Sequence, residues 1–418
     1  MSALTLTGAR VLDPASGRDE VVDVTIEGGC IARIGGTPAK ATRDVSSLAL
    51  LPGLIDMRVS TGEPGEENRE TLASAARAAV RGGVTTMVVQ PDTRPVIDDQ
   101  SLVEFVANRA RELPVNVLVA GALTVGLEGE RLTELGLLRE AGAVMFASGP
   151  QPVTDTALMR RILLYASTFD ALVANRCVEP GLAADAHESA FSSRLGLRGE
   201  PGIAETVMAA RDIALARDTG ARVLLDLVSS REVLSNIARA KAEGARVHAS
   251  TTINHLALNE IDIGDYRTFA KLRPPLRSAD DRAALLAAVA DGTVDIVVSD
   301  HDPQPSGAKR RPFADAAPGA VGVEIMLSVL TTLAANGEVE LMDILPAMTS
   351  RPAELLGLES GRIAEGAPAD LALVDLNAPW VCDGAKLASV AGNTPFDGRR
   401  LTGKVVGTWV GGVEVFGG

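Results

Sequence analysis

The segment PGLIDMRVSTGEPG, residues 52–65, decides the fold because it joins a buried strand to a sharp turn. An apolar stretch leads to Met57, and the Gly-Glu-Pro-Gly that ends at residue 65 turns the chain away. Between them lie Arg58 and Ser60, where a barrel strand would deliver side chains into a pocket. The segment therefore predicts a first strand that ends at a candidate functional site.

Seven further apolar runs follow this segment, and Ala-, Leu- and Arg-rich helical stretches separate them. Together with the first, the runs cover residues 50–59, 84–90, 115–123, 143–147, 171–176, 222–228, 245–250 and 294–299. Eight strand and helix pairs in this order predict an α/β chain that folds as a TIM (β/α)8 barrel. Side chains at the carboxyl ends of the strands would then line the pocket.

Both ends of the chain show a different texture from the middle. Residues 4–34, 361–376 and 403–417 consist of short alternating apolar stretches broken by turn residues, which is typical of small antiparallel strands. We therefore predict a small β-sandwich module formed by both termini. The expected domains are 1–50 and 359–418 for the two parts of this module, and 51–358 for the barrel.

Charge and cysteine content exclude several classes of protein. The 418 residues carry 40 Lys and Arg against 54 Asp and Glu, a net charge of -14, which disfavours binding to nucleic acid or to an anionic membrane. Cys30, Cys177 and Cys382 are far apart and form no CxxC pair, so neither a disulfide framework nor a zinc knuckle is indicated. No secretory signal or membrane-spanning run is apparent. We expect a soluble, cytoplasmic protein.

Several motifs, in this order, resemble the dihydroorotase family of the amidohydrolase superfamily across nearly the whole chain. They include PGLIDM with EPG after it, GGVTTMVVQPDTRPVID, PPLRS, SDHDP and RPFADAAPGAVGVE. The resemblance implies a barrel of the metal-dependent amidohydrolase type. In active members, histidines and carboxylates at the strand ends hold zinc, whose bound water is the nucleophile.

The metal-ligand positions of that family are degenerate here. A His-x-His pair, a bridging carboxylate and two single histidines are replaced, and one aspartate remains; the corresponding residues are Arg58, Ser60, Ser148, Arg176, Leu227 and Asp300. Arginine is not deprotonated in proteins and leucine has no donor atom, so the resemblance implies that zinc is absent and that Asp300 is vestigial. The family's substrate-binding positions also differ, and correspond to Gly62, Asp92, Arg273 and Gln304.

Arg58 and Arg176 are both expected to point toward Asp300 and to replace the charge of the metal, because a buried carboxylate needs a partner. Two alternatives stay open, an anion-binding pocket and a solvated, inert cleft. The four histidines, His187, His248, His255 and His301, form no closely spaced pair. We expect His187 to be exposed, His301 to be a satisfied structural residue, and the basic triplet at 309–311 to be a solvated surface.

The resemblance implies one function and leaves others open. Inactive dihydroorotase-like chains of bacteria are structural partners of aspartate carbamoyltransferase in de novo pyrimidine biosynthesis, so we expect a non-catalytic scaffold that binds the carbamoyltransferase catalytic chain and forms homo-oligomers. One alternative is an active dihydroorotase-like hydrolase of a cyclic amide, with a remodelled or metal-free site. Another is a sensor of small anions that uses Arg58, Arg176 and Arg273.

Overall fold

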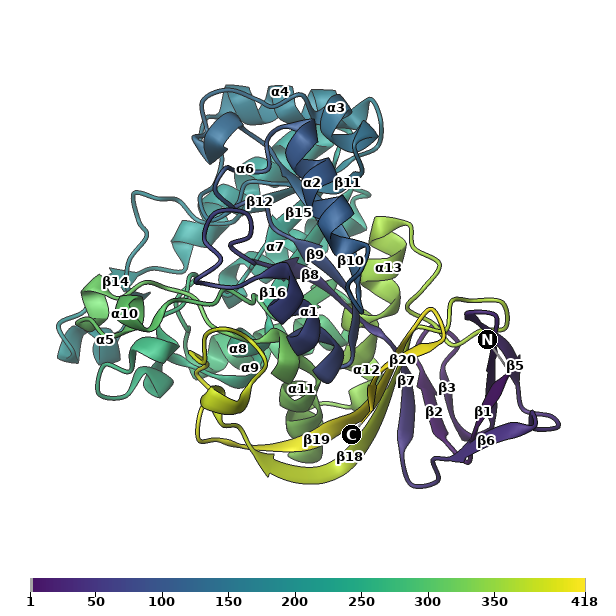
Figure 1. Ribbon diagram of the computed structural model, residues 1–418. Helices are drawn as coiled ribbons and strands as arrows, with labels where there is room; N and C mark the ends of the chain where they lie inside the picture. Colours follow the sequence, from purple (N-terminus) through teal and green to yellow (C-terminus); the bar gives the residue numbers. More distant parts are fainter. Residues whose placement is uncertain (1–2, 418) are drawn as a thin grey trace.

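The computed structural model describes residues 3–417, and all eight predicted apolar runs form strands in it. They lie parallel in one sheet of sequential order (Figure 1). The strands are β8 (Leu54–Val59), β9 (Val84–Val89), β10 (Asn116–Ala122), β11 (Ala143–Ala147), β12 (Leu172–Arg176), β15 (Arg222–Asp226), β16 (Val247–Thr252) and β17 (Ile296–Val298).

The sheet closes into a barrel where its first and last strands meet. Val59 forms a parallel bridge with His301, and the amide of Ser60 donates to the carbonyl oxygen of His301 at 2.8 Å. Deeper in the barrel, Asp56 of β8 accepts hydrogen bonds from the amide and the hydroxyl of Ser299. The predicted (β/α)8 barrel is therefore confirmed.

The interior of the barrel is packed with side chains and forms no open channel. Inward-facing residues of seven strands form one buried cluster, to which α13 (Ser350–Leu356) adds Ala353 and Leu355 from the amino end. The remaining strand, β16, places Ser250 and Thr252 at the carboxyl end, where both are fully buried. The polar part of the interior therefore lies at the end where the candidate site was predicted.

Helices cover the outside of the barrel between the strands (Figure 1). Their apolar faces pack on the sheet, and Thr71, Asp99, Asp155 and Ser230 cap the amino ends of four of them. The principal helices are α1 (Leu72–Arg81), α2 (Gln100–Ala110), α3 (Leu135–Glu140), α4 (Thr156–Ser167), α6 (Ile203–Thr219), α7 (Arg231–Ala242), α9 (Ala279–Ala290) and α11 (Met326–Ala335). Five short helices are α5 (Ala190–Arg194), α8 (Ile253–Ala257), α10 (Ser306–Lys309), α12 (Leu341–Ile344) and α13.

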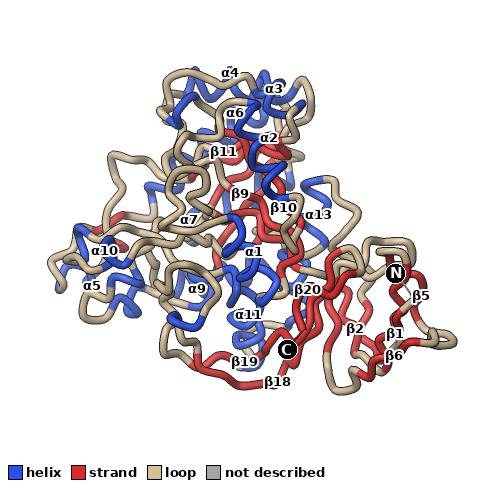
Figure 2. The backbone as a smooth tube through the Cα atoms, viewed as in Figure 1, coloured by secondary structure: helices blue, strands red, loops and turns tan. Residues whose placement is uncertain are grey.

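The two ends of the chain form one β module beside the barrel, as predicted (Figure 2). One sheet has the order β5-β4-β1-β6, and the other has the order β20-β19-β18-β7-β2-β3. A shared core that includes Trp409 lies between them. The strands are β1 (Leu4–Thr7), β2 (Arg10–Asp13), β3 (Arg18–Val21), β4 (Val24–Glu27), β5 (Cys30–Ile34), β6 (Ala41–Asp44), β7 (Ala49–Pro52), β18 (Leu371–Val381), β19 (Arg400–Val410) and β20 (Val413–Gly417).

The connection between β18 and β19, residues 382–399, leaves the module and returns to the carboxyl end of the barrel. Asn393 donates to the carbonyl oxygen of Gly319 at 3.0 Å and accepts from the amide of Gln304 at 3.0 Å. The C-terminal part of the chain thus contacts the loop that follows the eighth strand. Within residues 3–417, no helix has both the length and the apolar character needed to cross a bilayer.

The buried Asp56 makes the stability of the barrel depend on pH. Burial raises the pKa of Asp56 to about 6, although Ser299 and the amide of Arg58 donate hydrogen bonds to it. The pKa of Asp56 is higher in the folded than in the unfolded protein. The contribution of protonated Asp56 to folding stability is therefore complete below about pH 4 and is lost as the pH rises through about 6. We expect the loss to be about 3 kcal/mol. Asp56→Asn abolishes it in urea unfolding at pH 4 to 7.

An exposed carboxylate serves as the control for this titration. Asp265→Asn keeps the pH dependence of the unsubstituted protein, because Asp265 is exposed to solvent. Identical pH profiles for the unsubstituted chain and Asp56→Asn would contradict the assignment to Asp56.

Candidate functional site

Arg58 lies across the carboxyl end of the barrel and binds two carboxylates from other strands. Its Nε donates to Oδ1 of Asp300 at 2.9 Å, and its Nη1 lies 2.5 Å from Oδ2 of Asp226. The same Nη1 donates to Oε1 of Gln90 at 3.2 Å. The side chain of Arg58 is only 9% exposed, so these contacts are mostly shielded from water. The expected ion pair between Arg58 and Asp300 is confirmed.

The two carboxylates stabilise the charged form of Arg58. Burial lowers the pKa of a guanidinium, but the negative charges of Asp226 and Asp300 outweigh burial and hold the pKa of Arg58 above its ordinary value. Asp226 has a further partner, since the hydroxyl of Ser250 donates to its Oδ1 at 2.9 Å. The cluster therefore consists of one cation held by two carboxylates, each of which belongs to a different strand end.

Asp226 is the member of this cluster that sequence reasoning missed. The family's sixth-strand ligand position falls on the next residue, Leu227, whose side chain packs into the apolar interior of the barrel. Leu227 has φ 60°, a left-handed conformation that is costly for a leucine and that marks a sharp turn at the strand end. The available signal was an acidic residue at the end of the apolar run at 222–228.

Arg176 does not share the ion pairs of Arg58. Its Nη2 donates to the carbonyl oxygen of Arg273, and its amide donates to the hydroxyl of Ser148 at 3.1 Å. Burial, and then the nearby charge of Arg58, lower the pKa of Arg176. The expectation that both arginines pair with Asp300 is therefore correct for Arg58 and wrong for Arg176, because the guanidinium of Arg176 is directed at a backbone carbonyl.

The remaining positions from the resemblance are engaged with one another or with neighbouring loops. The hydroxyl of Ser60 donates to both carboxylate oxygens of Asp92, at 3.1 and 3.2 Å. Gln304 donates from Nε2 to Oδ1 of Asp302 at 2.8 Å. Gly62 has φ 72°, and a Cβ there would come within 2.6 Å of the carbonyl oxygen of Glu66. A larger side chain at residue 62 is thus excluded by the tight turn.

A cavity of about 460 Å³ lies at the rim of the barrel. Its lining includes Asp92, Asp302 and Gln304, together with Arg69, whose Nη2 lies 2.5 Å from Asp302. Burial raises the pKa of Asp302 to about 6, and Arg69 opposes this effect only in part. The lining therefore combines three carboxylates with two arginines, and it offers little to a negatively charged ligand.

The residues at the strand ends do not fit the zinc centre that the resemblance implies. Zinc takes neutral nitrogen, thiolate or carboxylate donors. The carboxylates of Asp226 and Asp300, at two of the strand ends, already bind the guanidinium of Arg58. Arg176 and Leu227 supply no donor to a cation. Throughout residues 3–417, no group of three or more His, Cys, Asp or Glu side chains is arranged to hold a metal ion.

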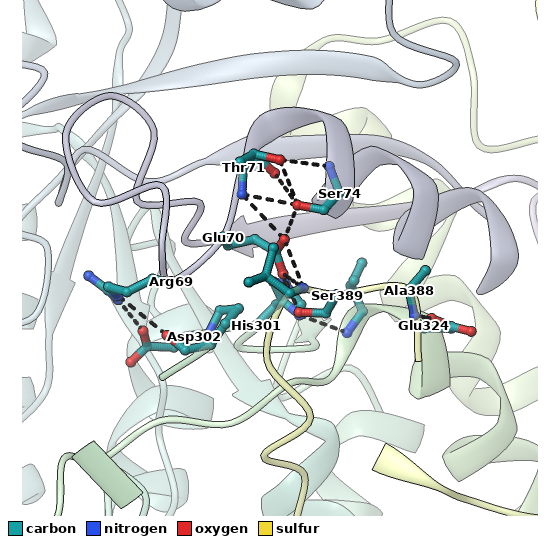
Figure 3. A network of polar contacts seen from close by, with 12 residues as sticks. Arg69, Glu70, Thr71, Ser74, His301, Asp302, Glu324, Ala388 and Ser389 are labelled. Atoms are coloured by element: carbon teal, nitrogen blue, oxygen red, sulfur yellow. Dashed lines mark hydrogen bonds and ion pairs between the residues drawn. The ribbon is translucent and has the colours of Figure 1, made fainter. Parts of the chain in front are cut away.

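His301 serves a structural network at the barrel rim, as expected (Figure 3). The amide of Gly322 donates to Nδ1 of His301 at 3.3 Å, so the proton of a neutral ring lies on Nε2, which is 3.3 Å from Oε2 of Glu70. Burial alone would raise the pKa of Glu70. Hydrogen bonds from His301, Ser389 and Ser74 outweigh burial, so the pKa of Glu70 lies below its ordinary value. Glu70 thereby joins the first and eighth strand ends to residues 382–399.

The other histidines lie apart from the Arg58 cluster. His248 lies at the amino end of β16, where its Nδ1 is 3.5 Å from Oδ1 of Asp295. His255 is buried, and its Nδ1 lies 2.8 Å from the hydroxyl of Thr252. His187 is partly buried, so the expectation of full exposure is wrong.

The expectation of a solvated basic triplet at 309–311 is correct in part. Arg310 and Arg311 are exposed, but Lys309 is buried, and its Nζ donates to the carbonyl oxygen of Thr268 at 3.1 Å. Burial lowers the pKa of Lys309 to about 8. Short helical turns order this loop, and backbone carbonyls stabilise the ammonium group.

Comparison with known proteins agrees with this architecture. Residues 48–233 match the family described as Dihydro-orotase-like. A dihydroorotase of Pelobacter propionicus is 38% identical over 99% of this chain and 99% of its own length. A dihydroorotase of Pelotomaculum thermopropionicum is 40% identical over 98% of this chain and 97% of its own length.

Solved structures support the same fold. The L-hydantoinase (dihydropyrimidinase) of Arthrobacter aurescens superposes with a TM-score of 0.90 at 23% identity, covering 100% of this chain and 96% of that one. The dihydropyrimidinase of Brevibacillus agri superposes with a TM-score of 0.84 at 21% identity, covering 99% and 95%. These structures show the same fold, and the identity of 38–40% over nearly the full length with dihydroorotases shows that the chain belongs to the dihydroorotase-like family.

Proposed function

We propose that this chain is a non-catalytic dihydroorotase homologue that acts as a structural partner of aspartate carbamoyltransferase in pyrimidine biosynthesis. The observation that carries the proposal is the guanidinium of Arg58 held between Asp226 and Asp300. A fixed organic cation occupies the centre of the strand ends, where the active family needs a metal and its bound water. The proposal therefore separates a retained fold from a replaced site.

The chemistry of the cluster favours a structural role over hydrolysis. Hydrolysis of a cyclic amide needs an activated water and a donor that stabilises the negative charge of the transition state. Arg58 directs its Nε and Nη1 to the carboxylates of Asp300 and Asp226, and each of these carboxylates accepts a hydrogen bond from the guanidinium. Neither group can act on a substrate unless the buried ion pair is first broken, which costs several kcal/mol.

A surface suited to protein contact supports the scaffold role. Exposed apolar side chains gather on neighbouring helices of the barrel, with Phe105 on α2, Leu137 on α3, Leu164 on α4, and Ile203 and Val207 on α6. Large apolar residues on one side of a protein often mark an interface. We propose that this helix surface contacts a carbamoyltransferase chain, in a zinc-free, cytoplasmic assembly.

Removing the guanidinium should destabilise the protein strongly. Arg58→Met leaves Asp226 and Asp300 buried without a cation, so we expect the unfolding free energy to fall by about 3–5 kcal/mol. The triple variant Arg58→Met, Asp226→Asn, Asp300→Asn recovers at least half of this loss, because no unpaired charge remains. Urea unfolding at pH 7 measures both effects.

The control for this cycle is an exposed ion pair. Arg160 lies 2.6 Å from Asp218 with half of its side chain exposed, so Arg160→Met is expected to change stability by less than about 1 kcal/mol. A loss of similar size in Arg58→Met and Arg160→Met would show that the buried cluster has no special structural weight.

Copurification tests the proposed partnership. Tagged protein isolated from its native cells is expected to bring down the aspartate carbamoyltransferase catalytic chain, and light scattering then gives the mass of the assembly. Ile203→Glu with Val207→Glu places charge on the helix surface and is expected to weaken capture, whereas Val21→Glu, at an exposed apolar residue of β3, leaves capture unchanged. Copurification without any carbamoyltransferase counts against the scaffold role.

Metal content and activity decide between the scaffold and the alternative hydrolase. The purified protein is expected to lack stoichiometric zinc and to leave dihydroorotate unchanged. Stoichiometric zinc, together with hydrolysis that Asp300→Ala abolishes, would establish the enzyme and overturn the proposal.

A further inference from the structure

A second site of unusual charge lies at the amino end of the barrel, opposite the Arg58 cluster. A cavity of about 720 Å³ opens there, at the starts of β15 and β16 and at the end of α13. This volume is within the range of sites that hold small metabolites. Its charged lining consists of four arginines, one histidine and three carboxylates: Arg139, Arg222, Arg246, Arg351, His248, Asp170, Asp295 and Glu354.

Two of the four arginines are held by carbonyl oxygens and not by carboxylates. Arg351 donates from Nη1 to the carbonyl oxygen of Val289 at 2.9 Å, and Arg139 donates to that of Phe169. Among the ion pairs formed within residues 3–417, none involves Arg139 or Arg351. Their positive charges are therefore available to a ligand in the cavity.

The carboxylates of the lining are largely committed to other cations. Asp170 lies 2.7 Å from Arg246 and 3.8 Å from Arg222, so two arginines share it. Asp295 lies 2.6 Å from Lys241, which approaches from outside the cavity lining, and 3.5 Å from His248. The cavity thus carries a surplus of positive charge in a chain whose net charge is -14.

At Arg222, the nearby carboxylate does not fully offset burial and the charge of a neighbouring arginine. Nη2 of Arg222 donates to the carbonyl oxygen of Leu355 at 2.5 Å, and its side chain is 18% exposed. Burial lowers the pKa of Arg222, Asp170 opposes this effect, and the adjacent Arg246 lowers the pKa again. An anion in the cavity would relieve the repulsion between Arg222 and Arg246.

We propose that the cavity at the amino end of the barrel binds the phosphate chain of an oligophosphate. A guanidinium group can bind two phosphate oxygens at once through two parallel hydrogen bonds. Several arginines around one cavity therefore suit a ligand with several phosphate groups. The lining contains no Phe, Tyr or Trp side chain on which a base could stack, so recognition rests mainly on the phosphates. This site is separate from the proposed scaffold role, because it lies at the other end of the barrel and needs no partner chain.

Calorimetric titration with sodium tripolyphosphate tests the site on the full-length protein at low ionic strength. We expect saturable binding that weakens at least tenfold in the double variant Arg246→Gln, Arg351→Gln, and that also weakens with added salt. Arg77→Gln, at an exposed arginine of α1, is the control and keeps the affinity of the unsubstituted chain. An unchanged circular dichroism spectrum and melting temperature of the ligand-free variants show that folding is preserved.

A parallel titration with ATP distinguishes the sources of the phosphate chain. Equal affinity for ATP and tripolyphosphate supports recognition of the phosphates alone, and tighter binding of ATP supports a nucleotide that uses the same arginines. No binding of either probe, or equal binding by the unsubstituted chain and the double variant, overturns the proposal. The scaffold proposal would stand in that event, since it predicts only the Arg58 cluster and the carbamoyltransferase contact.

Discussion

The burial of Arg58 is the constraint on which the rest of the barrel mouth depends. A guanidinium removed from water needs negative partners at fixed positions, and Asp226 and Asp300 supply them from the sixth strand and from the end of the eighth. One side chain therefore joins three strand ends that are distant in the sequence. The same contacts commit both carboxylates to a guanidinium, so the interaction that stabilises the mouth also changes its chemistry.

The rim of the barrel is closed by a second network that is centred on Glu70 and His301. Glu70 accepts hydrogen bonds from His301 and Ser389, and in this way it joins the loop after the first strand, the end of the eighth strand, and the connection between β18 and β19 (Figure 3). The C-terminal segment is thus part of the barrel rim as well as of the β module. Fold and site depend on different contacts, because core burial holds the fold while a few polar groups define the site.

The two ends of the barrel differ in electrostatic character. At the carboxyl end, Asp92 and Asp302 line the cavity at the rim, and burial raises the pKa of Asp302. At the amino end, four arginines face three carboxylates, two of which, Asp170 and Asp295, already have cationic partners. The end where the fold usually places its chemistry is therefore less suited to negatively charged ligands than the opposite end, where Arg351 donates to a carbonyl oxygen and forms no ion pair within residues 3–417.

The sequence by itself determined the eight strands, the shared terminal module and the charge at residue 58, because these follow from local patterns of apolar residues, turns and residue type. It could not assign Asp226 to the cluster, exclude Arg176 from it, or show that Lys309 is buried. Each of these depends on the direction of a side chain at the end of a strand or in a loop, where a single left-handed residue such as Leu227 changes which neighbour points inward. Only the tertiary structure brings residues 58, 226 and 300 together, since ion pairing in a barrel depends on strand closure and not on spacing along the chain.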